Sequence, residues 1–420
     1  MTAFAGVNVI PMTAVGEVAT GQTVLVRDGD IIAVGSQGQV RIPRGAEVID
    51  GKGRFLIPGL ADMHVHLEHF EDPKLLRLFP AYGVTLVRNM DGRHRILEWK
   101  EAVAAGELTG PEIITAGPIL DGDPPLLPDN TVIGNAEEAR EAVREQARAG
   151  YDFIKVYTNL SAGAYPAVVE TAAAEGLDVA GHIPRAIELS DAEVGHRSIE
   201  HVTDYGREVE AESSPFIDRW HWSKLLVGMP IDDRKLRRAA AEVAAADVWT
   251  VPTLVQPERA LADAGTLEEW LRAPEIDLLP SDAVEYWAER LSGATARMSD
   301  SDWELVRRGK SNRRAIVAAL HQAGADLLTG TDTPNPFVVP GASVHEEMEL
   351  LVDSGLTPAE ALIAGTRAAA QFLGRSDLGT ITVGSQADLV LLRQNPLENI
   401  RATREISGVM LDGRWISFEE

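Results

Sequence analysis

Two histidines separated by a single residue are the first feature of this chain that could do chemistry. His64 and His66 lie in the segment Asp62-Met-His-Val-His-Leu. On a β-strand, residues two apart point to the same face, so the two imidazoles could together chelate a metal ion. Solvated histidines on strands are common, so this pair alone does not establish a metal site.

Three more potential metal ligands follow apolar runs of the sequence. His182 lies in Val-Ala-Gly-His-Ile-Pro, His201 in Ser-Ile-Glu-His-Val, and Asp332 in Leu-Leu-Thr-Gly-Thr-Asp-Thr-Pro. Taken singly, each histidine could be a hydrogen-bonded core residue, and the aspartate could cap a helix. Chance would seldom place four histidines and an aspartate at matching ends of four predicted strands, so we interpret the set as a site.

Lys155 is an anomaly within the apolar segment Phe-Ile-Lys-Val-Tyr. A lysine inside a strand loses hydration unless its amine is paired. If CO₂ added to the neutral amine, the resulting carbamate would be an anion with two oxygens, able to bridge two divalent cations. The alternative is a lysine whose long stem lets its amine reach solvent or a carboxylate, and chemistry alone favours that alternative.

Three further residues are candidate substrate contacts. Tyr157 is two residues beyond Lys155 and could face the same side, or could only pack. Arg185 could bind a substrate carboxylate through two hydrogen bonds, although a surface ion pair is the more common role. His345 could reach the mouth of the site, but its neighbours fit an amphipathic helix, which favours a structural role.

The elements that must position these residues alternate between strand-like and helix-like segments. Such alternation predicts an α/β protein with a parallel sheet, and eight units suggest a (β/α)₈ TIM barrel, whose ligands bind at the carboxyl ends of the strands. The eight expected strands span residues 60–65, 84–89, 112–116, 153–157, 178–182, 198–202, 248–252 and 326–331.

Both ends of the chain instead consist of short β segments, with the turn signal Asp28-Gly29 between two of them. We therefore expect residues 1–57 and 375–420 to form one small β-sandwich domain beside a barrel of residues 58–374. Residues 211–303 are longer than one barrel unit requires and predict an inserted lid. They hold six of the eight tryptophans, which could line an apolar substrate site or could pack helices or a subunit interface; these are Trp220, Trp222, Trp249, Trp270, Trp287 and Trp303.

Composition narrows the class of partner. The formal net charge of −25 disfavours nucleic acid and anionic membranes, and the absence of cysteine excludes disulfides, thiolate nucleophiles and cysteine-bound metals. No apolar run is long enough to cross a membrane, and the first residues lack the pattern of a secretory signal. We expect a cytoplasmic homo-oligomer that acts on a small molecule.

The order His-x-His, Lys, His, His, Asp along eight strands resembles the amidohydrolase superfamily, in particular its binuclear branch with a carboxylated lysine. Further resemblance lies in Ile57-Pro-Gly-Leu-Ala-Asp-Met-His-Val-His, in Gly355-Leu-Thr-Pro-Ala-Glu-Ala-Leu and in Ala387-Asp-Leu-Val-Leu-Leu. Phe153-Ile-Lys-Val-Tyr, Gly181-His-Ile-Pro and Ser198-Ile-Glu-His are similar to the imidazolonepropionase-related group, which includes Xaa-Pro dipeptidases and ochratoxin-type amidases. Imidazolonepropionase itself is mononuclear and lacks the lysine, so Lys155 argues against that activity.

The resemblance implies a role for each candidate ligand. His64, His66 and Asp332 would hold the more buried metal, and His182 and His201 the second. Carboxylated Lys155 and a hydroxide would bridge the two ions, which we expect to be zinc, with manganese or cobalt as alternatives. Asp332 would transfer the proton from the hydroxide to the leaving nitrogen.

The expected activity is hydrolysis of an amide-type C–N bond in a dipeptide, an N-acyl amino acid or a similar small amide. The same centre could also attack a carbamate, a lactone or a phosphotriester. A barrel that only binds would be expected to lack ligands, and none is missing here.

Overall fold

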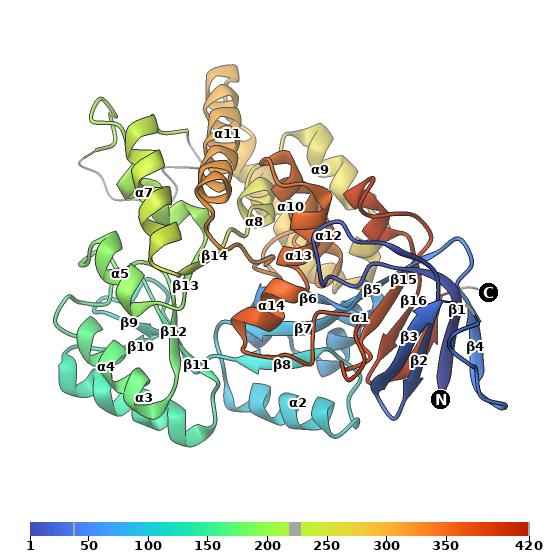
Figure 1. Cartoon of the computed structure of the whole chain (residues 1–420). Coiled ribbons are helices and arrows are strands. Elements are labelled where there is room, and N and C mark those ends of the chain that lie inside the picture. The colour runs from blue at the N-terminus through green and yellow to red at the C-terminus, as the bar shows by residue number, and fades with distance from the viewer. Residues whose placement is uncertain (37, 218–227, 419–420) are drawn as a thin grey trace.

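The computed structural model describes residues 1–36, 38–217 and 228–418. The two ends of the chain meet in a mostly antiparallel sheet at one side of the molecule (Figure 1), with strand order β17-β16-β15-β5-β1-β2-β3 and β4 beside β1. Leu56 of β5 pairs with Leu391 of β15, which joins the N-terminal strands to the C-terminal ones. The strands are β1 Thr2–Val9, β2 Ala19–Arg27, β3 Asp30–Ser36, β4 Glu47–Asp50, β5 Phe55–Pro58, β15 Leu389–Leu392, β16 Ile406–Leu411 and β17 Arg414–Ser417.

Apolar side chains from both chain ends form a common core on this sheet. Phe4, Val24 and Leu56 come from the N-terminal strands, and Leu389 and Met410 from the C-terminal ones. All five are completely buried. Since burial of apolar area is the main favourable term in folding, this shared core explains why strands so far apart in the sequence pair with one another.

The middle of the chain forms parallel strands. They are grouped as the sheet β6-β7-β8 and the sheet β10-β9-β11-β12-β13-β14. Parallel bridges outside the named strands link Ala116 to Phe153, Thr250 to Leu327, and Val65 to Thr333. The strands are β6 Leu60–Val65, β7 Val84–Asn89, β8 Glu112–Thr115, β9 Leu120–Asp121, β10 Thr131–Val132, β11 Phe153–Val156, β12 Asp178–Gly181, β13 Ser198–Glu200 and β14 Trp249–Val251.

Seven of the eight expected strands are present, with ends that agree within two residues. The eighth, residues 326–331, is an extended segment between β14 and β6 that forms one bridge, at Leu327, and a second bridge follows it at Thr333. Gly330 lets this segment approach its neighbours, because a Cβ there would lie 2.4 Å from Val251 and 2.9 Å from the Cβ of His64. The short strands β9 and β10 were not predicted.

Helices follow most of the parallel strands. In α3, the Asn135 side chain accepts hydrogen bonds from the backbone N–H groups of Glu137 and Glu138, and the helix ends at Gly150 with a φ of 88°. The α-helices are α1 Leu78–Ala81, α2 His94–Ala104, α3 Ala136–Ala149, α4 Tyr165–Glu175, α5 Leu189–Gly195, α6 Gly206–Val209, α7 Asp233–Ala245, α8 Val255–Arg259, α9 Ala264–Leu271, α10 Ser281–Thr295, α11 Asp300–Ala323, α12 Ala342–Asp353, α13 Pro358–Ala364 and α14 Arg367–Phe372. The 3₁₀ helices include η1 Leu67–His69, η2 Pro73–Arg77, η3 Val202–Tyr205, η5 Pro274–Leu278 and η6 Ile400–Arg404.

The tryptophan-rich region 211–303 is divided by β14 into two excursions. Trp249 lies within β14 and packs edge-on against Phe372. Trp270 of α9 and Trp287 of α10 both lie against Phe337, with ring centroids 5.5 and 5.8 Å away. These three tryptophans therefore pack the structure together, while Trp220 and Trp222 lie outside the described residues.

Within the described ranges, no helix combines the length and the apolar character needed to cross a membrane.

Candidate metal centre

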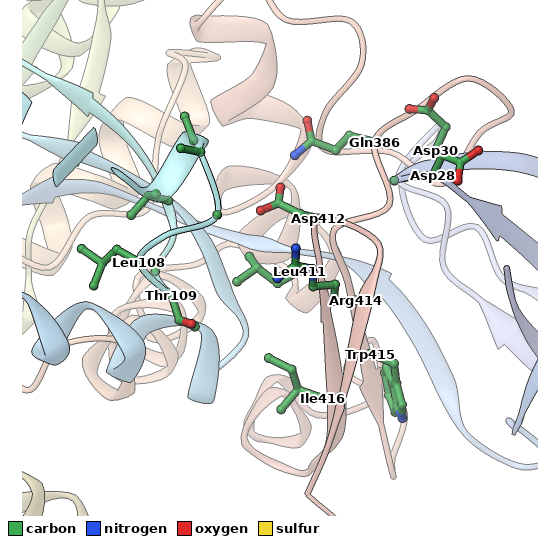
Figure 2. Close-up of a pocket in the computed structure, with 16 residues that line it drawn as sticks. Asp28, Asp30, Leu108, Thr109, Gln386, Leu411, Asp412, Arg414, Trp415 and Ile416 are labelled. Carbon is green, nitrogen blue, oxygen red and sulfur yellow. The ribbon is translucent and has the colours of Figure 1, made fainter. Parts of the chain in front are cut away.

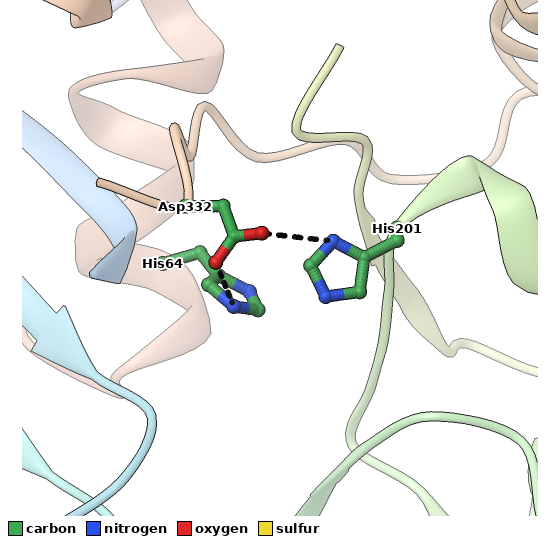
Figure 3. A group of neighbouring side chains, drawn as sticks. All are labelled: His64, His201 and Asp332. Carbon is green, nitrogen blue, oxygen red and sulfur yellow. Dashed lines mark ion pairs between the residues drawn. The ribbon is translucent and has the colours of Figure 1, made fainter. Parts of the chain in front are cut away.

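Asp332 lies among three of the predicted histidines. Its Oδ1 is 3.4 Å from Nε2 of His64 and 3.2 Å from Nε2 of His66, and its Oδ2 is 3.9 Å from Nδ1 of His201. Figure 3 shows the carboxylate of Asp332 between the rings of His64 and His201. One potential ligand atom from each of His64, His201 and Asp332 lies within 4.8 Å of the other two, so one cation could contact all three residues.

His182 and Lys155 complete the group. The rings of His182 and His201 are 4.9 Å apart, and β11 aligns Lys155 beside Ala180, two residues before His182. Lys155 is completely buried, and its Nζ has no hydrogen-bond partner among the described residues. Burial lowers the pKa of this amine from its ordinary value, although the nearby carboxylates oppose the change.

The candidate ligand residues His64, His66, His182, His201 and Asp332 lie at the carboxyl ends of β6, β12 and β13 and just after the eighth extended segment. His201 and Asp332 adopt positive φ angles of 66° and 63°, a region that side chains other than glycine seldom enter. Such conformations concentrate at functional sites, where the surrounding structure holds them in place. The Asp62 carboxylate accepts hydrogen bonds from the backbone N–H and the hydroxyl of Thr331, at 2.9 and 2.6 Å, and these hold the segment that carries Asp332.

Every predicted histidine ligand has a hydrogen-bond partner at Nδ1. For His64 this is Glu200 at 2.7 Å, and for His66 it is Glu68 at 2.6 Å. For His182 and His201 the partners are hydroxyls, of Thr158 at 3.1 Å and of Thr253 at 2.6 Å. Partners of this kind fix the orientation of a metal-binding imidazole.

The protonation of the group follows its surroundings. Burial lowers the pKa of His201 to about 3, and repulsion from His64 adds to the effect. Burial also lowers the pKa of His182, but for His66 the attraction of Glu68 and Asp332 outweighs burial and raises the pKa to about 10. For Asp332, burial would raise the pKa, but the proximity of His64 and His66 outweighs burial and holds the pKa well below the ordinary value. At neutral pH the site thus pairs an ionised carboxylate with neutral imidazoles at His182 and His201, whereas His66 carries a proton that metal binding would release.

Of the three candidate substrate contacts, only Tyr157 lies against the group of candidate ligands. The ring of Tyr157 lies 4.0 Å from the ring of His182, at the edge of the group. Arg185 is exposed and donates a hydrogen bond to Asn159. His345 is not brought to the group: it lies within α12, where its Nδ1 contacts the Thr403 hydroxyl at 2.9 Å and its Nε2 contacts the Tyr82 carbonyl at 3.1 Å.

Sequence reasoning did not single out the buried partners of the histidines. Glu200 and Arg88 are ionisable residues inside apolar strands, the same signal that drew attention to Lys155. Glu68 follows His66 by two residues and is mostly buried. The partners on His182 and His201, Thr158 and Thr253, carry no comparable signal, because threonine is common near strand ends.

The structure also contains a cavity of about 690 Å³ away from this group (Figure 2). It lies between the sheet of the two chain ends and the segment after α2. Leu108 and Thr109 line one side, and Asp412, Arg414 and Trp415 line the other. None of the predicted site residues lines it, so the candidate chemistry and this cavity are separate.

The residues of the group fit a divalent metal centre. Histidine nitrogens and carboxylate oxygens suit zinc, manganese or cobalt. The buried Nε2 of His64 and Nζ of Lys155 lack hydrogen-bond partners among the described residues. Because unpaired buried polar atoms are costly, their presence here indicates a ligand.

Comparison with known proteins identifies a family that matches most of the chain. The model of the amidohydrolase family matches residues 55–416. Ochratoxinase of Aspergillus niger is 24% identical over 418 residues, covering 84% of this chain and 73% of the relative. Imidazolonepropionase of Acidiphilium cryptum is 26% identical over 400 residues, covering 92% and 90%.

A solved structure extends the likeness to the fold. Bottromycin amidohydrolase superposes with a TM-score of 0.78 at 26% identity, covering 99% of this chain and 86% of that one. With a family match over most of its length, the chain belongs to the amidohydrolase family and is a hydrolase that acts on amide-type carbon–nitrogen bonds.

Proposed function

We propose that this enzyme hydrolyses the amide bond of a dipeptide, an N-acyl amino acid or a similar small amide at a centre of two divalent metals. The observation that carries the proposal is the cluster of buried His64 and Asp332 with half-buried His201, and the unpaired amine of Lys155 close by. The proposal requires ligands for two ions. Of the six proposed ligand residues, five provide an imidazole or a carboxylate, and the sixth is Lys155.

In this proposal His64, His66 and Asp332 hold one ion, and His182 and His201 hold the other. Lys155 would supply the remaining anionic ligand as its carbamate, because a buried amine without a partner favours the neutral form, to which CO₂ adds with release of a proton. Two ions bound there supply a hydroxide nucleophile and a Lewis acid at neutral pH. Zinc is the expected metal, and manganese or cobalt would also suit these ligands.

The chain's own residues then move the proton. Asp332 contacts His64 and His66 through Oδ1, which leaves Oδ2 on the side of His201. An ionised carboxylate in this position accepts the proton of the nucleophile and returns it to the nitrogen of the leaving amine. Tyr157 lies beside His182 and contacts substrate at the edge of the centre.

For the scaffold we propose a closed (β/α)₈ barrel of residues 58–374, with a small β-sandwich domain formed by residues 1–57 and 375–420. The parallel bridges Ala116–Phe153, Thr250–Leu327 and Val65–Thr333 support closure, since they link the end of β8 to β11 and, through residues 327–333, β14 to β6. The common core of the chain ends supports the second domain.

A substrate panel with metal-loaded enzyme tests the proposed activity. Dipeptides and N-acyl amino acids should be hydrolysed, and removal of metal by a chelator should abolish the rate until zinc, manganese or cobalt is returned. Carbamates, lactones and phosphotriesters form the comparison set, because a binuclear centre can attack these as well. A higher kcat/KM for any of them than for every amide would overturn the substrate class.

A further inference from the structure

A buried arginine and a buried glutamate lie behind the ligand histidines, on the side away from Asp332. Arg88 belongs to β7 and Glu200 to β13, and both are at most 1% exposed. Neither residue is a predicted metal ligand. Burying two ions is costly unless each is paired and hydrogen-bonded, so their presence in the core requires an explanation.

The pair is fully hydrogen-bonded and reaches three strands. Nη2 of Arg88 donates to Oε1 of Glu200 at 2.6 Å, Nη1 donates to the Ser198 hydroxyl at 3.0 Å, and Nε donates to the Met63 carbonyl at 2.8 Å. The guanidinium also lies over the rings of Phe153 and Phe372, with centroid distances of 5.4 and 4.9 Å. Such packing leaves Arg88 a single position.

Glu200 connects the fixed guanidinium of Arg88 to His64. Its Oε1 accepts hydrogen bonds from Arg88 and from the Ser198 hydroxyl, while its Oε2 contacts Nδ1 of His64 at 2.7 Å. A carboxylate only accepts hydrogen bonds, so Nδ1 of His64 must carry its proton and Nε2 is left as the lone-pair nitrogen. That Nε2 is the atom that faces Asp332.

We propose that Arg88 and Glu200 are positioning residues that orient His64 and increase its basicity as a metal ligand. The inference rests on the proposed metal centre. The inference gives the pair a function beyond stability, because one carboxylate oxygen of Glu200 contacts the proposed ligand His64 while Arg88 binds the other oxygen.

The chain contains a matched control. Glu258 of α8 also pairs with a buried arginine, Arg313, at 3.2 Å, and also with Lys310 at 2.8 Å. No metal-ligand histidine appears among these contacts. The substitutions Glu200→Gln and Glu258→Gln therefore make the same chemical change in a buried arginine pair, and only the first touches a proposed ligand.

Metal affinity and metal-induced stabilisation form the test, because a merely structural role would leave both unchanged. Wild type, Glu200→Gln and Glu258→Gln are freed of metal, and Co²⁺ is titrated against a competing chelator while the visible spectrum and Tm are recorded. Glu200→Gln should weaken cobalt binding by roughly 10–100-fold, alter the cobalt spectrum and reduce the rise in Tm on metal addition. Glu258→Gln should lower Tm with and without metal equally.

Arg88→Lys keeps the charge but loses the planar fork, so it provides a second variant if Glu200→Gln fails to fold. It should also weaken cobalt binding, whereas Arg313→Lys should not. Wild-type affinity and spectrum in either Glu200→Gln or Arg88→Lys would overturn the inference. Failure of the wild-type chain itself to bind cobalt or zinc would instead overturn the proposed function.

Discussion

The two pairs of histidines in the centre differ in what supports them. His64 and His66 each contact a carboxylate at Nδ1, whereas His182 and His201 each contact a threonine hydroxyl. A carboxylate partner fixes the tautomer and raises the basicity of an imidazole more than a neutral hydroxyl does. Four histidine ligands with different partners therefore need not bind metal with equal affinity. We call the His64–His66 and His182–His201 pairs the two halves of the centre, and we expect the His64–His66 half to retain its metal more firmly.

Asp332 is the residue that contacts both halves, so its change should have the largest effect. Asp332→Asn keeps the shape of the side chain but removes its basic oxygen, and kcat should fall by roughly 10²–10⁴-fold. Steady-state kinetics on an amide substrate, with metal content measured in the same sample, provide the check. Activity within a few-fold of wild type would assign proton transfer to another group.

Lys155 should matter next, because it is proposed to join the halves. Lys155→Ala should lower both metal content and rate, and short carboxylic acids should partly restore them by occupying the bridging position. Lys100→Ala is a suitable control, since the Lys100 amine is already paired with Asp152 at 2.6 Å. Full metal content and rate in Lys155→Ala would exclude the bridging role.

Removing one histidine from each half separates their contributions. His64→Ala should reduce binding of both metals, while His182→Ala should release mainly the second metal. Stepwise dialysis of wild type against a chelator should likewise show one ion leaving before the other. Loss of both ions in a single step, with identical metal content in the two variants, would remove the distinction between the halves.

The sequence pointed to the residues that the structure brings together, and to most strands, because both leave local signals. His-x-His on a strand, or a lysine within an apolar run, can be recognised without knowing the fold. Seven strands were found for the same reason, since each is a short apolar run between helix-like segments.

What could not be predicted depends on contacts between distant segments. Residues 326–331 have the sequence pattern of a strand, but only Leu327 forms a bridge, in a segment that is closely packed at Gly330. The contact between Glu200 and His64 joins residues 136 positions apart, and that between Trp287 and Phe337 joins separate helical and loop segments. Likewise, only the fold determines that His345 is held by Tyr82 and Thr403.

The smallest predicted effect is on the pH dependence of stability and concerns Asp388, which lies outside both halves of the proposed metal centre. Burial raises the pKa of Asp388, beside β15, to about 7 from the ordinary 3.8. The folded protein therefore binds this proton more tightly than the unfolded chain, so the associated stability is present below about pH 4 and is lost as pH rises toward 7.

Asp388→Asn should flatten that part of the dependence of unfolding free energy on pH while leaving metal content unchanged. Denaturant unfolding at pH 5 and pH 8 measures the difference. Asp50→Asn, which changes an exposed carboxylate, is the control. An unchanged pH slope in Asp388→Asn would show that the buried carboxyl does not contribute it.

The central claim is a centre of two metals that hydrolyses amides, and elemental analysis of the purified protein alongside its amidase rate tests it most directly. We predict two divalent ions per chain, with the rate falling as they are removed and returning when they are restored. Full amide hydrolysis by protein that contains no divalent metal would contradict the account.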